Sequence, residues 1–552
     1  MKSKINFNSI IYIFFIIYFL IGFLIYKDYG VGIEEHFQRQ NGFYWLNYFF
    51  SNSNFNNFKE LVNIKYNLIL INNHNLPNPD YFNFYGIIFD LPMAFIETFL
   101  RLESSKLYFE LRHLFIFLIF FISSIFFYKI IKNRFNDKLI ILMGLFFYVA
   151  SPRIFGDSFH NNKDILFLSF LVIATSYLFD LFKNHNNKTL ILFCLFSAIA
   201  TSTRIMGIYL PILAIIFYYL EFLIKKYTFK YFLKISLQIF FLFIFFLYLH
   251  YPYIWELNLL NIGSWFNKFF HWMDIKVLFS GEYYSIKYLP RSYLPIWILI
   301  STPIFICLFI LIGAFFSGRQ IYLRIISIDN KKENKNGDLW QSIDEKKDLF
   351  IFTSFFSFLF YTIFLNVAML SAWRHFYFLH FFLIYLSIIG LENVYKLLIK
   401  KISIKIVYLI SFIILTNLIY TNIQFHPFQS LFFNNLMSSK KIEKYQVDTP
   451  LLGRSHALKY ILTLENKKEK IILANSSWAP MYNGKDMLKS EVKDKFIFVG
   501  QNYTQADYIY NNYIYKNDEK FNKNYKVPAN FRKIKDYKID NVLIYSIFQR
   551  EN

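Results

Sequence analysis

Charged residues are scarce in this chain of 552 residues: they make up 17%, against 56% hydrophobic and 22% aromatic residues. A single soluble core cannot bury so much apolar side chain, which excludes a soluble globular enzyme and a disordered chain. The only two cysteines, Cys194 and Cys307, lie within apolar runs, so a disulfide framework and a Cys/His metal site are also excluded. The composition therefore predicts a polytopic α-helical membrane protein.

Long apolar runs take the place of a soluble core. A spanning helix needs about 20 mostly apolar residues, and we count eleven such stretches. They are 8–26, 111–130, 139–155, 165–183, 189–206, 207–224, 231–251, 293–316, 349–369, 376–394 and 403–421. No small-residue cleavage site follows the first stretch, so we expect an uncleaved span there and not a removed signal peptide.

The distribution of positive charge predicts the orientation. Lys and Arg number 59 against 37 Asp and Glu, a formal net charge of +22. In a membrane protein such an excess is typical of cytoplasmic loops, and a nucleic acid partner is not expected. With a cytoplasmic N-terminus, the loops rich in Lys and Arg all fall on the inner side: 129–138, 183–188, 225–234, 317–348 and 395–406. We therefore predict a multi-pass protein of the cytoplasmic (inner) membrane with an extracytoplasmic C-terminal part.

Two outer segments are too large to be simple connections. The segment 27–110 contains amphipathic stretches such as 85–100, which we expect to lie at the membrane interface. After residue 423 the apolar runs shorten to strand length, at 470–474, 496–499, 507–510 and 542–547, with a helical pattern at 456–464. This pattern predicts a small α/β domain over 424–552, separate from a membrane module over 1–423.

Ionisable residues at the ends of spans are costly and therefore mark candidate functional sites. Under the predicted topology they gather at the outer face. The carboxylates Glu34 and Glu35 follow the first span directly. Paired carboxylates repel each other, and a low dielectric raises the pKa of at least one of them, which suits a general base. The alternative is a solvated helix N-terminus, where acidic residues favour the helix dipole.

The segment Asp28-Tyr29-Gly30-Val31-Gly32-Ile33-Glu34-Glu35 resembles the first external loop of the GT-C superfamily of polyprenyl-phosphate-sugar-dependent glycosyltransferases. The resemblance is closest to glycosyltransferase family thirty-nine, which holds protein O-mannosyltransferases and the lipid A aminoarabinose transferase. Further motifs occur in the family's order: Arg112-His113, Ser151 to Asp164, Thr203 to Gly207, Trp373 to Phe378 and His426 to Gln429. One departure is Glu34, where the family usually has Asp; the side chain is one methylene longer.

The resemblance implies a GT-C-like fold and an inverting transfer of a sugar from a polyprenyl-phosphate donor at the outer face of the membrane. The acceptor would be a glycan, a lipid or a protein. Glu34 would be the base that deprotonates the acceptor, and Glu35 would orient the site or tune the pKa of its neighbour. Residues expected to bind the donor phosphate are Arg153, Lys163, Arg204, Arg374 and His375, with Asp28, His160 and Asp164 as further site candidates.

Other interpretations remain open at this point. Cations at helix ends can simply snorkel to the interface, and Lys163 with Asp164 can form an ion pair that stabilises a loop. No metal or other cofactor is required, although Asp157, His160 and Asp164 carry suitable ligand atoms for a divalent ion. The main alternative function is a transporter or flippase of a lipid-linked saccharide, which would place ionisable groups near the bilayer midplane and show paired repeats. A third interpretation of the function is a noncatalytic scaffold.

Overall fold

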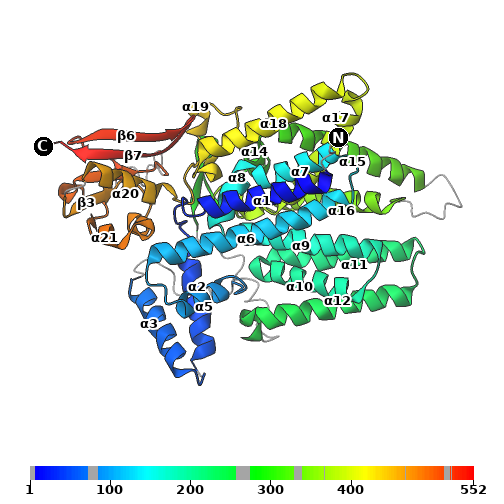
Figure 1. Cartoon of the computed structure of the whole chain (residues 1–552), viewed down its shortest axis with the longest axis horizontal. Helices are drawn as coiled ribbons and strands as arrows, with labels where there is room; N and C mark the ends of the chain where they lie inside the picture. Colours follow the sequence, from blue (N-terminus) through cyan, green and yellow to red (C-terminus); the bar gives the residue numbers. More distant parts are fainter. Residues whose placement is uncertain are drawn as a thin grey trace.

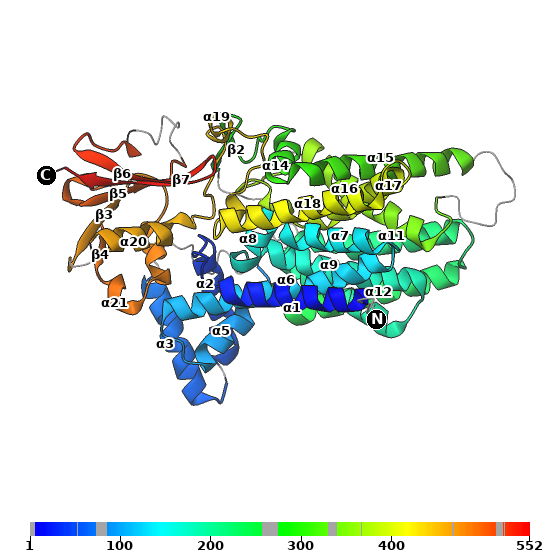
Figure 2. The same cartoon turned by 45° about the horizontal axis from the view of Figure 1, so that its top comes forward.

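The computed structural model shows a bundle of long helices with a sheet domain at one end (Figures 1 and 2). It describes residues 6–551, except 52, 73–84, 257–273, 329–338, 366, 466–467, 515–522 and 524. Within these ranges, nine helices are long and apolar enough to cross a membrane. They are α1 (Phe7–Ile25), α6 (Ser105–Lys132), α9 (Asp164–Lys183), η1 with α11 (Ile205–Ile208 and Tyr209–Leu223), α12 (Phe229–His250), α15 (Ile304–Ile328), α16 (Ile343–Phe364), α17 (Leu379–Leu398) and α18 (Ile404–Phe425). The polytopic helical fold is thus confirmed.

The predicted number of eleven spans is too high by this criterion. The span expected at 139–155 is a bent pair, α7 (Lys138–Ala150) and α8 (Pro152–His160), at 52° to each other, which brings the number among the described residues to ten. The chain bends where Pro152 begins α8, because proline fits the first turn of a helix but cannot continue one. The span expected at 189–206 is α10 (Asn187–Thr203), which at 17 residues is short.

The span expected at 293–316 is also interrupted. The short α14 (Tyr293–Ser301) ends before Thr302 and Pro303, and α15 then runs on to Ile328. Much of the inner loop expected at 317–348 is therefore helical, and its polar centre, Asp329 to Asn334, lies outside the described residues.

Glycine allows α15 and α17 to pack closely. A Cβ atom at Gly313 would collide with the carbonyl of Leu386, and one at Gly390 would collide with the carbonyl of Phe309. Small residues of this kind let helix backbones approach each other where lipid supplies no hydrophobic driving force.

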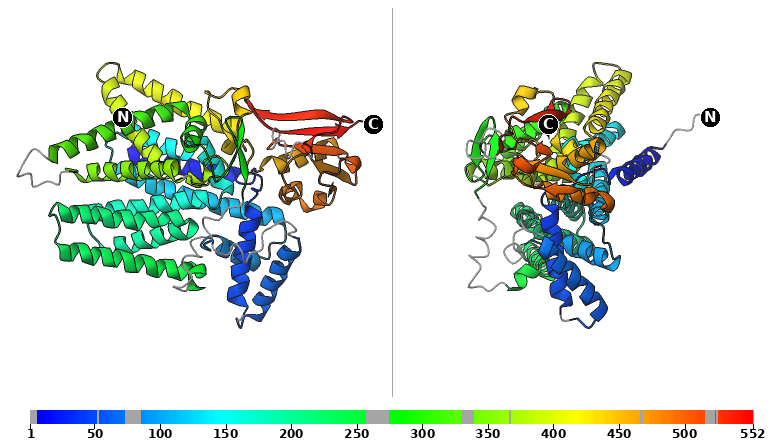
Figure 3. Two further views of the ribbon diagram at one scale, coloured as in Figure 1. Left: turned by 180° about the vertical axis from the view of Figure 1, so that it is seen from behind. Right: turned by 90° about the vertical axis from the view of Figure 1, so that its left-hand side faces the viewer.

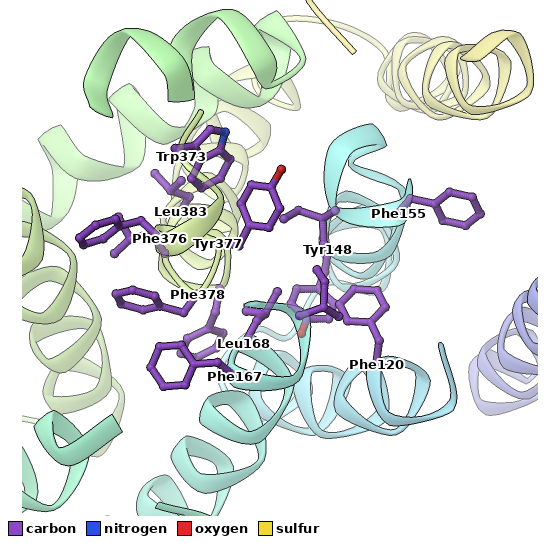
Figure 4. Packing of buried hydrophobic residues seen from close by; sticks show 14 of the residues in the cluster. Phe120, Tyr148, Phe155, Phe167, Leu168, Trp373, Phe376, Tyr377, Phe378 and Leu383 are labelled. Atoms are coloured by element: carbon purple, nitrogen blue, oxygen red, sulfur yellow. The ribbon is translucent and has the colours of Figure 1, made fainter. Parts of the chain in front are cut away.

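The core of the bundle is rich in aromatic side chains. Figure 4 shows Tyr148 and Phe120 on one side of the buried cluster and Trp373, Phe376 and Phe378 on the other. The Trp373 ring donates a hydrogen bond of 2.8 Å to the Ser301 hydroxyl. This packing holds the short η4 (Arg374–Phe376), and with it two of the candidate cations, in a defined position.

The helices described between α1 and α6 form a projection at the side of the bundle, seen in Figure 3. Its described helices are α2 (Glu35–Phe50), α3 (Asn56–Asn72) and α5 (Asp90–Phe99), the last within the stretch expected at the interface. Arg39 on α2 pairs with Glu97 on α5 at 2.6 Å and fastens the two helices together. A further outer segment contains the hairpin of β1 (Lys276–Phe279) and β2 (Glu282–Ser285), which we did not predict.

The C-terminal part is an α/β domain, as expected. Its five-stranded sheet has the order β4-β3-β5-β7-β6, with β3 parallel to both β4 and β5 and with β7 antiparallel to β5 and β6. The strands are β3 (Ile471–Asn475), β4 (Phe496–Phe498), β5 (Tyr508–Asn511), β6 (Phe531–Ile539) and β7 (Val542–Arg550), and the helices are α19 (Ser439–Ile442), α20 (Gly453–Leu464) and α21 (Ser490–Lys493). Among the strands of this sheet, β6 had no counterpart in the sequence prediction, because six of its nine residues are Arg, Lys, Asp or Tyr.

This domain is fastened to the loop that follows α1. The fully buried guanidinium of Arg454 donates hydrogen bonds of 2.9 Å to the carbonyl oxygens of Leu451, Pro480 and Val31. The backbone N–H of Ile33 donates to the carbonyl of Pro450 at 3.0 Å. Two residues beyond Glu34, His36 pairs with Asp486 at 2.8 Å. The loop 31–36 therefore contacts the C-terminal domain at three points.

Replacing Arg454 by Lys should loosen this loop. The three carbonyls are contacted by three different nitrogen atoms of Arg454, and the single nitrogen of a lysine cannot reach all of them. A lost hydrogen bond to a charged group costs about 1.5–3 kcal/mol. We expect amide hydrogen exchange in residues 29–36 to become about tenfold faster or more, measured by mass spectrometry on the full chain in nanodiscs. Arg532→Lys, at an exposed position of β6, is the matched control. Unchanged exchange in Arg454→Lys would show that the loop is held by other contacts.

Candidate functional site

A small cavity lies where the loop after α1 meets the end of α8 and the start of η4. Its lining residues are Gly32, Ile33, Glu34, Glu35, Gln38, Asp157, His160, Asn161, Asn162, Arg374 and Pro450. Its volume of about 20 Å³ leaves space for about one water molecule. Elements far apart in sequence, including the C-terminal domain through Pro450, thus converge on one point at the end of the bundle next to that domain.

Glu34 occupies the N-cap position of α2 and contacts Arg374 directly. Burial alone would raise the pKa of Glu34, but Arg374 and then Lys163 outweigh this effect and hold its pKa below the usual value. Glu34 is therefore ionised at neutral pH and paired with a cation, and in this arrangement it is a weak base.

Arg374 bridges two carboxylates and continues into a chain of ion pairs. Its Nε lies 3.2 Å from Asp164 Oδ2, and Asp164 also pairs with Arg204. The amide of Asn161 donates to the same Asp164 carboxylate at 3.0 Å. Burial works against the charge of Arg374, but Glu34 and Asp164 outweigh it and raise its pKa, so this arginine stays charged. Arg374 thus contacts Glu34 directly, whereas Arg204 is one ion pair further away, at Asp164.

Lys163 and His375 complete the group of basic side chains. The Lys163 ammonium lies over the Tyr85 ring, 3.1 Å from its centroid, and does not form the ion pair with Asp164 that we considered. Burial, partly offset by Glu34, lowers its pKa to about 8. Burial and then Arg204 and Arg374 lower the pKa of His375 well below its usual value. His375 is therefore a neutral hydrogen-bonding group at pH 7, where we had expected a cation.

Glu35 stabilises the loop that carries Glu34. Its carboxylate accepts a hydrogen bond of 2.7 Å from the backbone N–H of Gly32 and lies 3.0 Å from the His113 Nε2 on α6. The Glu35 side chain is buried, so both contacts are shielded from water. These two contacts place Glu35 where it can hold the loop in position, which agrees with the predicted orienting role. That role stays a prediction.

Asp157 and His160 form the wall of the cavity opposite Glu34. The Tyr377 hydroxyl donates to Asp157 at 3.0 Å, and Asn161 donates to its other oxygen at 3.4 Å. His160 Nε2 lies 3.8 Å from Asp157. These contacts fix the carboxylate, and they tie η4 to α8.

Six predicted site residues do not line this cavity: Asp28, Arg153, Lys163, Asp164, Arg204 and His375. Asp28 pairs with His426 at 3.0 Å near the surface and thereby fastens the loop to the end of α18. Arg153 donates to the Phe432 carbonyl at 2.9 Å, with its guanidinium over the rings of Trp297 and Phe433. We expected Arg153 to lie with the other cations, and this was wrong. Arg153 lies in the first turn of α8, and its side chain points toward the segment after α18.

In the parts of the chain that the structure describes, no three His, Cys, Asp or Glu side chains are grouped as a metal site would need. Asp157 and His160 are neighbours, but Asp164 is engaged by two arginines. Independence of metal ions stays a prediction.

Several residues of the site were not found from the sequence. Asn161 and Tyr377 lie within the motifs that carry the family resemblance, which was the available signal, although no role had been assigned to them. Pro450 and Arg454 had no such signal, because they are more than 400 residues away from the loop that they contact.

Comparison with known proteins bears on the membrane module. Residues 92–251 match the family model described as dolichyl-phosphate-mannose-protein mannosyltransferase. The matched stretch includes Arg112, Asp157, Lys163 and Arg204 but not Glu34 or Arg374. No curated protein matches the chain. The match confirms, over these residues, that this multi-pass protein resembles GT-C superfamily glycosyltransferases of family thirty-nine.

Proposed function

We propose that the protein is an inverting glycosyltransferase that moves a sugar from a polyprenyl-phosphate donor to an acceptor at the outer face of the cytoplasmic membrane. The observation that carries the proposal is the contact of Glu34 with Arg374, beside Lys163 and Arg204. A carboxylate in contact with Arg374, with further basic side chains beside the cavity that Arg374 lines, offers the two parts that this chemistry needs: a base for the acceptor and fixed positive charge for the leaving phosphate.

In the proposed reaction, Glu34 takes the proton from an acceptor hydroxyl while the acceptor oxygen attacks the anomeric carbon. The bond between that carbon and the phosphate oxygen breaks, and the configuration inverts because no glycosyl-enzyme intermediate forms. The polyprenyl phosphate leaves with one more negative charge. Arg374, with its planar fork of donors, and the point charge of Lys163 would stabilise that charge.

The contact between Glu34 and Arg374 also sets an order of events. A cavity of about 20 Å³ has no room for a sugar, so the pair must separate when the donor enters. The donor phosphate can replace Glu34 as the anionic partner of Arg374. Glu34 then loses the cation that most lowers its pKa and becomes a stronger base at the moment when the acceptor requires one. Donor binding would thus activate the base.

The family name directs the first assays. Because the matched model is described by dolichyl-phosphate-mannose as donor and protein as acceptor, mannosyl-phospho-polyprenol and unfolded protein substrates are the first pair to test, followed by lipid and glycan acceptors.

Glu34→Gln should abolish transfer. Glutamine keeps the shape of the side chain but cannot accept the proton, and loss of general base catalysis costs about 10²–10⁴-fold in rate. The measurement is transfer of radiolabelled sugar from polyprenyl-phosphate donors by purified protein in nanodiscs. Glu60→Gln, on the exposed side of α3, should retain full activity. Full turnover by Glu34→Gln would exclude Glu34 as the base.

Arg374→Gln should both slow the reaction and shift its pH dependence. Loss of a donor to the leaving phosphate should reduce kcat by about 10²–10³-fold. Arg374 lowers the pKa of Glu34, so its removal raises that pKa, and the acid limb of kcat/KM, where activity falls as Glu34 becomes protonated, should move to higher pH.

Arg532→Gln serves as the control for this variant and should leave the profile in place. An acid limb that stays where it is in Arg374→Gln, or moves to lower pH, would contradict the assignment of that limb to Glu34.

A further inference from the structure

A second cavity lies at the opposite end of the bundle, between the ends of α6, α9 and α16. It has a volume of about 220 Å³, far more than the cavity at Glu34. It is lined by Ile130, Asn133, Ser176, Phe179, Asp180, Lys183, Ile343, Asp344 and Lys347. In Figure 2 this is the end of the helices that points away from the C-terminal sheet.

The two cavities are separated by about the thickness of a membrane. The helix α9 begins at Asp164, beside Arg374, and ends at Lys183, in the second cavity. Its 20 residues at about 1.5 Å each give a length of about 30 Å, which matches the hydrocarbon core of a bilayer. The second cavity therefore lies at the level of the lipid headgroups of the other leaflet, the one that the Lys/Arg distribution assigns to the cytoplasm.

Charges of both signs line this cavity in equal number. The acidic members are Asp180 and Asp344 and the basic members are Lys183 and Lys347, and apolar residues of all three helices complete the wall. Lys347 is largely buried, with its side chain 7% exposed, and lies 2.9 Å from Asp344, while Asp180 lies 2.5 Å from Lys129. The side chains of Asp180 and Asp344 are 32% and 45% exposed and Lys183 is exposed, so a ligand that enters the cavity displaces water from charged groups and must supply charges that match them.

A ligand with only a phosphate would meet two carboxylates, and one with only an amine would meet the lysines. A zwitterion satisfies both, with its phosphate toward Lys183 and Lys347 and its ammonium toward Asp180 and Asp344. An ammonium group also donates hydrogen bonds to carboxylates, which a trimethylated amine cannot do.

We propose that this cavity binds the phosphoethanolamine headgroup of a membrane lipid, in the leaflet opposite to the Glu34 site. The lipid, and not a soluble phosphoethanolamine, is the ligand because the apolar side chains Ile130, Phe179 and Ile343 share the wall with the charged groups and would contact the upper acyl chains. The lipid is bound and not consumed, and the site is independent of glycosyl transfer.

The experiment is native mass spectrometry of the full chain, released from nanodiscs that contain equal amounts of phosphatidylethanolamine, phosphatidylcholine and phosphatidylglycerol. We expect phosphatidylethanolamine to be retained at least fivefold over either of the others. In Lys183→Gln that preference should be lost, while Lys188→Gln, an exposed lysine at the same end of the bundle that does not line the cavity, should keep it.

Asp180→Asn gives a second, directional measurement. It removes a partner of the ammonium and keeps both lysines of the cavity, so retention should shift toward phosphatidylglycerol. Equal retention of the three lipids by the unaltered protein, or an undiminished preference in Lys183→Gln, would overturn the proposal. Binding of soluble O-phosphoethanolamine as tight as that of the lipid would overturn the assignment to a membrane lipid.

Discussion

The Glu34 site depends on a chain of buried ion pairs, which connects the loop after α1 to η4, to the start of α9 and to the end of α10. Arg374 contacts both Glu34 and Asp164, and Arg204 contacts Asp164 as well. A buried charge without a partner is strongly destabilising, so each member of this chain requires the next. The same requirement makes the site responsive: an incoming anion can replace Glu34 on Arg374 without leaving the arginine unpaired.

The C-terminal domain is part of this arrangement and not only an appendage. Pro450 forms part of the cavity wall, and Arg454 binds the carbonyl of Val31, three residues before Glu34. A Cβ at Gly30 would approach the Leu452 carbonyl to 2.7 Å, so the loop requires glycine there to pass beneath the domain. The position of the carboxylate is therefore set from two sides, by the membrane helices through Glu35 and His113 and by the domain through Arg454.

The two ends of the bundle differ in a way that agrees with an enzyme better than with a carrier. Ionisable groups of the Glu34 site lie at helix ends and in the loops between them, and not at the middle of the spans. The second charged cavity is at the far ends of α6, α9 and α16, with aromatic packing between the two levels. A carrier would instead place its binding groups near the midplane.

The sequence by itself determined the membrane class, the position of most of the spans and the α/β character of the C-terminal part, because hydrophobic length and periodicity are local properties of the chain. It also drew attention to Glu34, Lys163, Arg204 and Arg374, since ionisable residues at helix ends are conspicuous in an apolar sequence. The sequence could not determine in which direction a side chain points or how far it lies from residues remote in the chain. The placement of Arg153 against the Phe432 carbonyl, the neutral state of His375 and the contact of Arg454 with Val31 all arise from packing between segments remote in sequence. Only the tertiary structure decides such contacts, because a side chain's neighbours, and therefore its charge state, are absent from its local sequence.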